Sequence, residues 1–345
     1  MPPSPDGLGS CECSEAGAGS REPEAVSRER HAASLRAGSR LPAPGFRLMP
    51  YALQLPAPGS RLAAFVFLAT LLPFAVLAQS STPAIEALPT SVRSAGMGGT
   101  AVSLIGYAGS VFTNPAGLGP VRVLSLEGIA SRVDSSTYFG GAAAMRLGRL
   151  NLGGGVRYLR FDEGNELYDN VESAAAITLR VMGVALGAGA AYYSIEDSAG
   201  AIRRTLTAST AVTLAFFDIM ALAFTARNLG EWAVTGEQLD LPTQIGIGFN
   251  MNLVDTYSNW RLLAAIERSW TDGQGLTHFG LEGGAVVYGI GIVARAGAGG
   301  HPVGGVFSNA TFGGSLVLGR GALDYAYLDR ENTGPLHLFG LRWTP

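Results

Sequence analysis

Lysine is absent from this sequence, and cysteine is nearly so. The chain has 345 residues, its 24 basic residues are all arginine, and its 2 cysteines are Cys11 and Cys13. Both cysteines lie in an N-terminal stretch that we expect the mature protein to lack, which excludes a disulfide framework and a thiolate metal site. A formal net charge of −3 gives no basic surface for a nucleic-acid partner.

Long apolar runs are also missing, with one exception. The exception is LAAFVFLATLLPFAVL at residues 62–77, which follows Arg61. A membrane-spanning helix needs about 20 apolar residues, so this shorter run predicts a signal peptide at 60–78 with cleavage near Ala78 and Gln79. An N-terminal membrane anchor that is not cleaved is the alternative.

Residues 1–59 are a mixture of proline, glycine, alanine, serine and arginine without apolar periodicity. Such a segment buries too little apolar surface to offset the entropy lost on ordering. We therefore predict a disordered extension. Our hypothesis is that translation begins at Met49, so that most of this extension is not made.

Glycine is abundant, with 48 residues, and from residue 121 onward apolar residues alternate with polar or small ones. In VESAAAITLRV at 171–181, Ile177 and Leu179 share one face, while Glu172 and Arg180 share the other. Successive side chains of a strand point to opposite sides of a sheet, so such a segment has one apolar and one mixed face. The pattern recurs in WRLLAAIERS, THFGLEGG and HLFGLRW.

The predicted fold class is all-β: a transmembrane antiparallel β-barrel over 121–345, preceded by a short N-terminal hatch at 79–120. We expect about fourteen strands of roughly ten residues, at 121–131, 136–147, 150–161, 171–181, 183–195, 203–216, 218–228, 242–252, 259–269, 276–285, 286–297, 307–318, 321–329 and 335–343. A soluble β-sandwich is the alternative, but its water-facing sides would carry more charges. Export then predicts a location in the bacterial outer membrane.

Alternation places the charged residues of these strands toward the barrel lumen. An arginine that faces lipid near the membrane midplane costs about 2–4 kcal/mol, so we expect Leu179→Arg and Ile266→Arg to impair assembly far more than Arg180→Ala or Glu267→Ala. We favour structural ion pairs over a ligand-binding role for the lumen-facing candidates. These are Glu172, Arg180, Arg261, Glu267, Glu282, Arg295, Asp324 and Arg342.

Ahead of the first strand, SAGMGGTAVSLIGYAGSVFTNPAGLG at 94–119 combines two motifs. A dinucleotide site needs GxGxxG spacing between a strand and a helix, which is not present, so we do not expect phosphate binding. Pro115 disfavours helical conformation at Asn114, whose side chain can cap or turn the backbone. We expect short helical pieces that plug the lumen. The hatch motif consists of Gly96, Gly98, Gly99, Asn114, Pro115, Ala116 and Gly117.

Both motifs resemble the N-terminal signature of the PorV/PorQ family and of the wider FadL-like outer-membrane proteins. TARNLG at 225–230, LPTQIGIGF at 241–249 and GGSLVLGRGALDYAY at 313–327 also resemble PorV/PorQ-type sequences. The resemblance implies a hatch with an Asn-Pro-Ala-Gly step ahead of a fourteen-stranded barrel. Two features depart from it: residues 105–109 lack the acidic residues that many relatives carry, and the chain ends Trp343-Thr344-Pro345 instead of on an aromatic residue.

The resemblance implies two alternative functions. FadL-like barrels passively admit hydrophobic small molecules past a hatch, through a kink or side opening, and this uptake is the function that we predict. PorV/PorQ-type barrels resemble components of type IX secretion, where they bind partner or cargo proteins as scaffolds. Neighbouring secretion genes would favour the scaffold. Outer-membrane lipid surrounds the barrel in either case.

An enzyme is not expected from this sequence. His278, His301 and His337 are widely spaced, and no serine, histidine and acidic residues form a recognisable catalytic motif. A lone histidine on a strand is usually one more polar residue of its face. We therefore predict no catalytic residues, no metal and no cofactor.

Overall fold

The computed structural model describes most of the predicted hatch and barrel. The described ranges are 83–133, 136–163, 166–197, 200–217, 219–235, 239–255, 260–300, 307–330 and 334–345. The predicted extension, the predicted signal peptide and the first residues of the predicted hatch lie outside these ranges, so they stay predictions.

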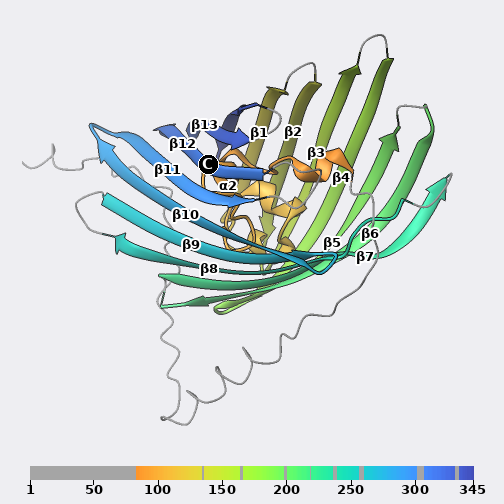
Figure 1. Ribbon diagram of the computed structural model, residues 1–345. Coiled ribbons are helices and arrows are strands. Elements are labelled where there is room, and N and C mark those ends of the chain that lie inside the picture. Colours follow the sequence, from red (N-terminus) through yellow and green to blue (C-terminus); the bar gives the residue numbers. More distant parts are fainter. Residues whose placement is uncertain are drawn as a thin grey trace, which may run out of the picture. The chain divides into compact units, whose positions relative to one another are not determined.

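Antiparallel strands form a closed barrel in which each strand pairs with its neighbours in the chain, and β14 pairs with β1 (Figure 1). The strands are β1 (Leu124–Val133), β2 (Ser136–Leu147), β3 (Leu150–Glu163), β4 (Glu166–Val181), β5 (Val184–Glu196), β6 (Ile202–Phe216), β7 (Met220–Thr235), β8 (Gln244–Asp255), β9 (Trp260–Thr271), β10 (Gln274–Val287), β11 (Ile290–Gly300), β12 (Phe307–Leu318), β13 (Gly321–Arg330) and β14 (Leu336–Trp343). Closure removes the two exposed edges that an open sheet would have.

The fourteen strands confirm the predicted fold class, and β2 and β12 have the predicted bounds. The other twelve strands differ from the predicted bounds at one or both ends, and two of these differences are instructive. β7 continues from the predicted end at 228 to Thr235 because its pairing with β6 resumes after a register shift. The turn expected between 285 and 286 lies at Tyr288-Gly289, where both residues have positive φ, as a two-residue hairpin turn of type I′ requires.

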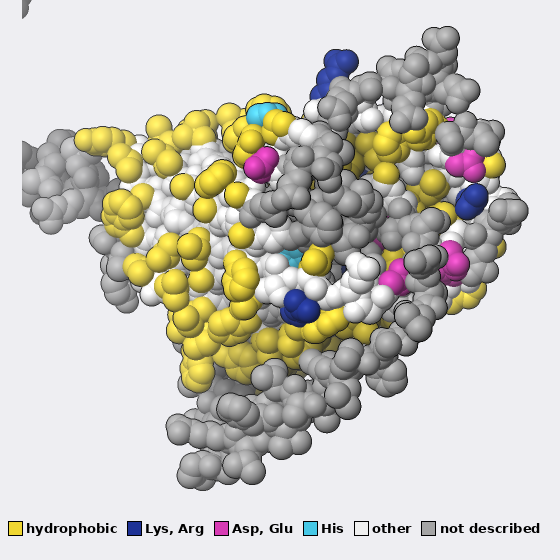
Figure 2. Space-filling view, in the orientation of Figure 1, with side chains coloured by type: hydrophobic (Ala, Val, Ile, Leu, Met, Phe, Trp, Pro, Cys, Tyr) yellow, Lys and Arg dark blue, Asp and Glu magenta, His cyan; other side chains and the backbone are white. Residues whose placement is uncertain are grey.

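Burial along the strands follows the predicted alternation. On β4, Glu172 and Thr178 are 0% exposed, whereas Ile177 is 46% exposed and Leu179 is 40% exposed. Hydrophobic side chains cover much of the barrel wall on the face seen in Figure 2. The large apolar residues of the wall thus point outward, whereas those of a soluble β-sandwich point into a core between its two sheets.

The core of the protein lies inside the barrel, where residues 83–121 fill the lumen (orange in Figure 1). We call this segment the hatch. It contains η1 (Ala84–Ala87), α2 (Val92–Ala95), η2 (Ala108–Phe112) and η3 (Pro115–Leu118). Ile85 packs in a buried cluster with Leu338 of β14, and Leu118 packs in another with Ala144 of β2. No helix among the described residues is long and apolar enough to cross a membrane.

The two ends of the barrel differ in their connections. At the turn end, where β1 begins and β14 ends, the strands are joined through residues 148–149, 182–183, 217–219, 288–289 and 319–320. At the loop end the connections include the longer segments 197–201 and 236–243. The loop end also has a two-residue connection at 272–273, so its connections vary in length more than those of the turn end.

Candidate functional site

The glycine motif of the hatch allows the hatch backbone to touch the barrel wall. Gly98 and Gly99 have φ of 72° and 85°, a region that glycine adopts without steric cost. A Cβ on Gly98 would lie 2.7 Å from the backbone nitrogen of Ala298 on β11. The Gly98 amide donates to Thr311 Oγ1 of β12 at 2.8 Å. The motif therefore serves close approach to two strands.

The Asn114-Pro115-Ala116-Gly117 motif begins η3, with the extended Asn114 (φ −142°, ψ 91°) as its N-cap. Asn114 Oδ1 accepts from the Gly117 amide at 3.1 Å, and its Nδ2 donates to the Val102 carbonyl at 2.6 Å. Gly117 lacks the positive φ that would make glycine obligatory. Its requirement is space, because a Cβ there would lie 3.0 Å from Ser110 Oγ.

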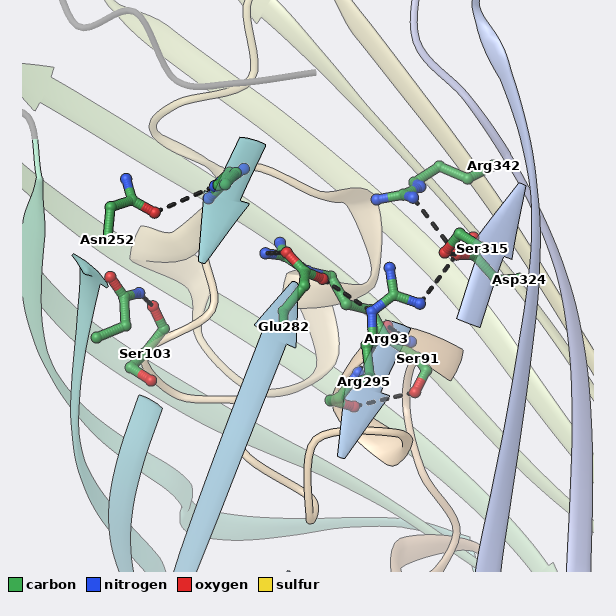
Figure 3. Close-up of polar contacts among 12 residues, drawn as sticks. Ser91, Arg93, Ser103, Asn252, Glu282, Arg295, Ser315, Asp324 and Arg342 are labelled. Atoms are coloured by element: carbon green, nitrogen blue, oxygen red, sulfur yellow. Dashed lines mark hydrogen bonds and ion pairs between the residues drawn. The ribbon is translucent and has the colours of Figure 1, made fainter. Parts of the chain in front are cut away.

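An ion-pair network joins the hatch to the β10–β14 side of the wall (Figure 3). Arg93 on α2 binds Glu282 of β10 through both of its carboxylate oxygens, at 2.7 and 2.8 Å. Arg295 of β11 bridges Glu282 (2.8 Å) and Asp324 of β13 (3.3 Å), and Arg342 of β14 lies 3.4 Å from Asp324. Burial alone lowers the pKa of Arg93, but the Glu282 carboxylate more than offsets this, and the pKa is raised. The pair therefore stays charged.

On the opposite side of the lumen, Arg157 of β3 forms an ion pair with Glu172 of β4. Arg157 is 1% exposed and Glu172 is 0% exposed. The Arg157 guanidinium also donates to the hatch carbonyls of Leu88 at 2.9 Å and Ile85 at 3.2 Å. A buried arginine is tolerated where it is both paired and hydrogen-bonded. Here Glu172 is the ion-pair partner, and the two hatch carbonyls are hydrogen-bond acceptors.

Glu86 of η1 ties the hatch to an irregular part of the wall. Its carboxylate accepts from Tyr193 of β5 at 2.6 Å, from Asn228 of β7 at 3.1 Å and from Gln244 of β8 at 2.7 Å. Asn228 has a positive φ of 55°, and the β6–β7 register shifts nearby. The β7–β8 ladder extends only as far as the pair between Arg227 and Gln244.

Glu267 of β9 binds the hatch backbone directly. Its carboxylate accepts from the amides of Ala101 at 2.7 Å and Val102 at 2.8 Å. Removal of the carboxylate would leave both buried amides without an acceptor, which costs about 1–3 kcal/mol per group. The tolerance of Glu267→Ala that we expected from the sequence therefore does not follow from this geometry.

The structure brings only some of the eight lumen-facing candidates together. Glu282, Arg295, Asp324 and Arg342 form one network, and Glu172 and Glu267 bind at two separate points. Two arginines lie outside these contacts: Arg261, whose Nε donates to Asn252 Oδ1 at 3.1 Å, and the half-buried Arg180 near the turn end.

Five charged residues at the interface of hatch and wall were missing from the sequence prediction. Arg157, Glu127 and Arg227 lie on strands at inward positions, so the alternation rule could have identified them. Arg227 of β7 lies 3.7 Å from Glu86. Glu127 of β1 accepts from the Gly109 amide at 3.0 Å. Glu86 and Arg93 lie in the hatch, where no periodic pattern marks which side chains meet the wall.

The described residues contain no group of histidine, cysteine, aspartate and glutamate side chains that could hold a metal ion. His278 of β10 contacts the hatch, with Nδ1 at 2.8 Å from the Gly98 carbonyl oxygen. The polar groups described above mostly bind one another. Their contacts between hatch and wall hold the hatch inside the barrel as a plug.

An apolar depression of about 250 Å³ lies in the wall beside the irregular segment of β7. Its large side chains come from neighbouring strands β6 to β9 and are Val212, Phe224, Ile245, Ile247 and Trp270. Ile245 is 46% exposed, so the depression opens on the outer side of the wall, opposite the Glu86 contacts.

No protein-family model matches the sequence, and no curated protein matches it. Solved structures do match. The toluene transporter TodX of Pseudomonas putida has 12% identity and a TM-score of 0.51, over 77% of this chain and 98% of that one. The toluene transporter TbuX of Ralstonia pickettii has 11% identity and a TM-score of 0.50, over 76% and 99%.

The monoaromatic hydrocarbon channel CymD has 10% identity and a TM-score of 0.54, over 76% of this chain and 99% of that one. At these identities the similarity shows the fold alone. The chain therefore has the barrel fold of these proteins, while its resemblance to the FadL-like and PorV/PorQ families stays a prediction.

Proposed function

We propose that this protein is a β-barrel of the bacterial outer membrane that admits small hydrophobic molecules when its hatch moves. The apolar outer face suits a hydrocarbon environment, and the polar inner face suits a lumen. The same fold serves as a toluene transporter in TodX and as a monoaromatic hydrocarbon channel in CymD. Because the hatch fills the lumen, passage requires part of it to be displaced.

The contact between Glu86 and the irregular segment of β7 is the observation that carries this proposal. One carboxylate holds η1 against Asn228 and Gln244, at the point where the pairing of β7 with β8 stops. The apolar depression lies just outside. Release of Glu86 would loosen the wall at the end of the β7–β8 ladder, beside an apolar surface, so a hydrophobic molecule could leave sideways without entering water.

A reversible lock between hatch and wall tests whether uptake requires the hatch to move. Ala116 of η3, Ala185 of β5 and Ala211 of β6 form one buried cluster, and disulfide-bonded residues have Cβ atoms about 3.5–4.5 Å apart. The variant is Ala116→Cys with Ala185→Cys. Both natural cysteines precede residue 14, within the segment predicted to be absent from the mature chain, so the background is free of thiols.

The readout is uptake of a labelled monoaromatic hydrocarbon by host cells with an intact lipopolysaccharide layer. We expect the oxidised variant to lose the uptake that the barrel provides and the reduced variant to regain it. Each single-cysteine variant, treated with the same oxidant, is the matched control. Uptake that is equal with and without the barrel would contradict the proposed function.

Deletion of residues 94–116 tests the role of the hatch as a plug. The strand ladder satisfies its own backbone hydrogen bonds, so we expect an assembled barrel that conducts ions across planar bilayers, where the intact protein conducts little. A deletion variant that does not assemble would make the segment part of the structural core. An assembled variant that conducts no better than the intact protein would refute the plug.

The scaffold of a type IX secretion system is the alternative that the sequence left open. It requires no movement of the hatch, so the oxidised lock should leave it intact. Secretion of proteins with the matching C-terminal sorting domain, lost on deletion of this gene and restored by the locked variant, would favour the scaffold.

A further inference from the structure

Five arginines lie on neighbouring segments of the turn end, in the sector that runs from the β12–β13 turn through β14 and β1 to β4. We call them the arginine arc: Arg320, Arg122, Arg146, Arg149 and Arg180. Backbone hydrogen bonds join their segments, from the Thr344 amide to Arg320 (2.9 Å), from the Arg146 amide to Val123 (2.9 Å) and from the Arg180 amide to Arg149 (3.0 Å). Arg180 is half-buried and the other four are exposed.

The arc gathers charge of one sign, unlike the loop end. The segments that carry it contain no aspartate or glutamate; they are 120–126, 145–151, 178–185 and 317–322. At the loop end, Arg160 lies 3.9 Å from Asp169, and Arg203 lies 3.5 Å from Asp197. These arginines are paired with carboxylates, so within the described part of the chain the basic sector belongs to the turn end.

The turn end also carries large apolar side chains at the tips of its turns. Met182 is 73% exposed, Phe217 is 80% exposed and Tyr288 is fully exposed, and all three have φ between 51° and 53°. Among residues other than glycine, this conformation favours asparagine and aspartate. The loop end follows that preference with Asp272 (φ 50°) ahead of Gly273. Apolar side chains in such turns suit a membrane interface better than open water.

We propose that the turn end lies among lipid headgroups and that the arginine arc is a binding site for anionic phospholipid, with the guanidinium groups on the phosphates. This inference rests on the membrane-embedded barrel proposed above. Arginine suits the role because its planar guanidinium donates two parallel hydrogen bonds to phosphate oxygens. The absence of lysine from the chain leaves arginine as its only permanently charged cation.

The side chains between the arginines favour lipid over a soluble acidic partner. Val123 is 62% exposed, Leu147 is 55% exposed and Leu318 is 51% exposed, and each lies within three residues of an arc arginine. Charged groups thus alternate with apolar ones at the boundary of the apolar wall. A headgroup and its acyl chains satisfy both at once, whereas an acidic protein surface satisfies only the arginines.

The test uses the mature protein in phosphatidylcholine vesicles that contain a minor fraction of phosphatidylglycerol. Spin-labelled phosphatidylglycerol and phosphatidylcholine report how strongly each lipid is selected at the protein surface. Arginine near an anionic surface contributes about fivefold in binding, so we expect the wild type to select phosphatidylglycerol at least fivefold. Arg146→Gln with Arg149→Gln and Arg320→Gln should lose most of this selection, while hydrocarbon uptake stays unchanged.

The control variant removes the same charge at the loop end, with Arg132→Gln, Arg160→Gln and Arg203→Gln, and should keep the selection. Equal loss in both triple variants would show a general charge effect and overturn the site. Suppression by inorganic phosphate, but not by chloride at equal ionic strength, would show an anion site without lipid preference and would also overturn it. Failure of the wild type to insert contradicts the proposed barrel, whereas insertion without selection contradicts only this inference.

Discussion

The inner and outer faces of the barrel wall use alternate residues of the same strands, yet they meet different demands. On β3, a Cβ on Gly153 would lie 2.6 Å from Leu118 of the hatch, whereas one on Gly154 would meet nothing closer than the Ala174 carbonyl at 3.7 Å. The size of each inner residue is thus limited by the hatch atoms that it contacts. Outer residues need only be apolar, so their identity is far less restricted.

The largest effect is expected at the most buried charge of the inner face. Arg157→Met leaves Glu172 without its ion-pair partner at 0% exposure, and removal of one member of a buried pair costs about 3–5 kcal/mol. Urea unfolding in detergent micelles measures the loss. The double variant Arg157→Met with Glu172→Leu should recover much of it. If Arg157→Met were as stable as the wild type, water would have to reach Glu172 on the inner face.

Substitution on the outer face should cost nearly as much. Ile266 is 43% exposed in the middle of β9, where Ile266→Arg would place a charge in lipid at a cost of about 2–4 kcal/mol. Leu179→Arg should cost less because Leu179 lies near the end of β4, closer to the interface. Arg180→Ala is the inward control and should assemble well. Equal assembly of the Ile266 and Arg180 variants in vesicles would mean that the outer face does not meet lipid.

Neighbouring glycines on β3 offer a smaller but closely matched comparison. Gly153→Ala should displace Leu118 and cost about 1–3 kcal/mol by overpacking. Gly154→Ala, one residue along, should change the unfolding free energy by less than about 0.5 kcal/mol. Both are measured by the same urea titration. A larger loss of stability for Gly154→Ala than for Gly153→Ala would mean that Gly154, and not Gly153, faces the hatch.

Pro115→Ala should have the smallest effect. Asn114 is held in its extended conformation by three side-chain hydrogen bonds as well as by the proline ring, so loss of the ring removes only one of its constraints. We expect a loss of at most about 1 kcal/mol and a slight rise in bilayer conductance. Asn114→Ala, which removes all three hydrogen bonds, should raise conductance more. A larger rise in conductance for Pro115→Ala than for Asn114→Ala would make the proline ring the main constraint on Asn114.

Much of the fold was predictable because strand periodicity is local. Alternation over 171–181 gave the inward position of Glu172 and the outward position of Ile177 without knowledge of any neighbour, and the predicted fold class was correct. Boundaries that depend on a partner were less predictable. The end of β7 at Thr235 is set by renewed pairing with β6 after a register shift, and the sequence of β7 alone contains no mark of it.

The sequence by itself determined the strand number and the inward or outward alternation along regular strands such as β4, because these follow from residues adjacent in the chain. Only the tertiary structure decided the partners. Arg93 meets Glu282 across a separation of 189 residues, and Glu86 reaches the irregular segment of β7 across 142 residues. Such contacts depend on closure, register and the path of the hatch together, and a local pattern specifies none of the three.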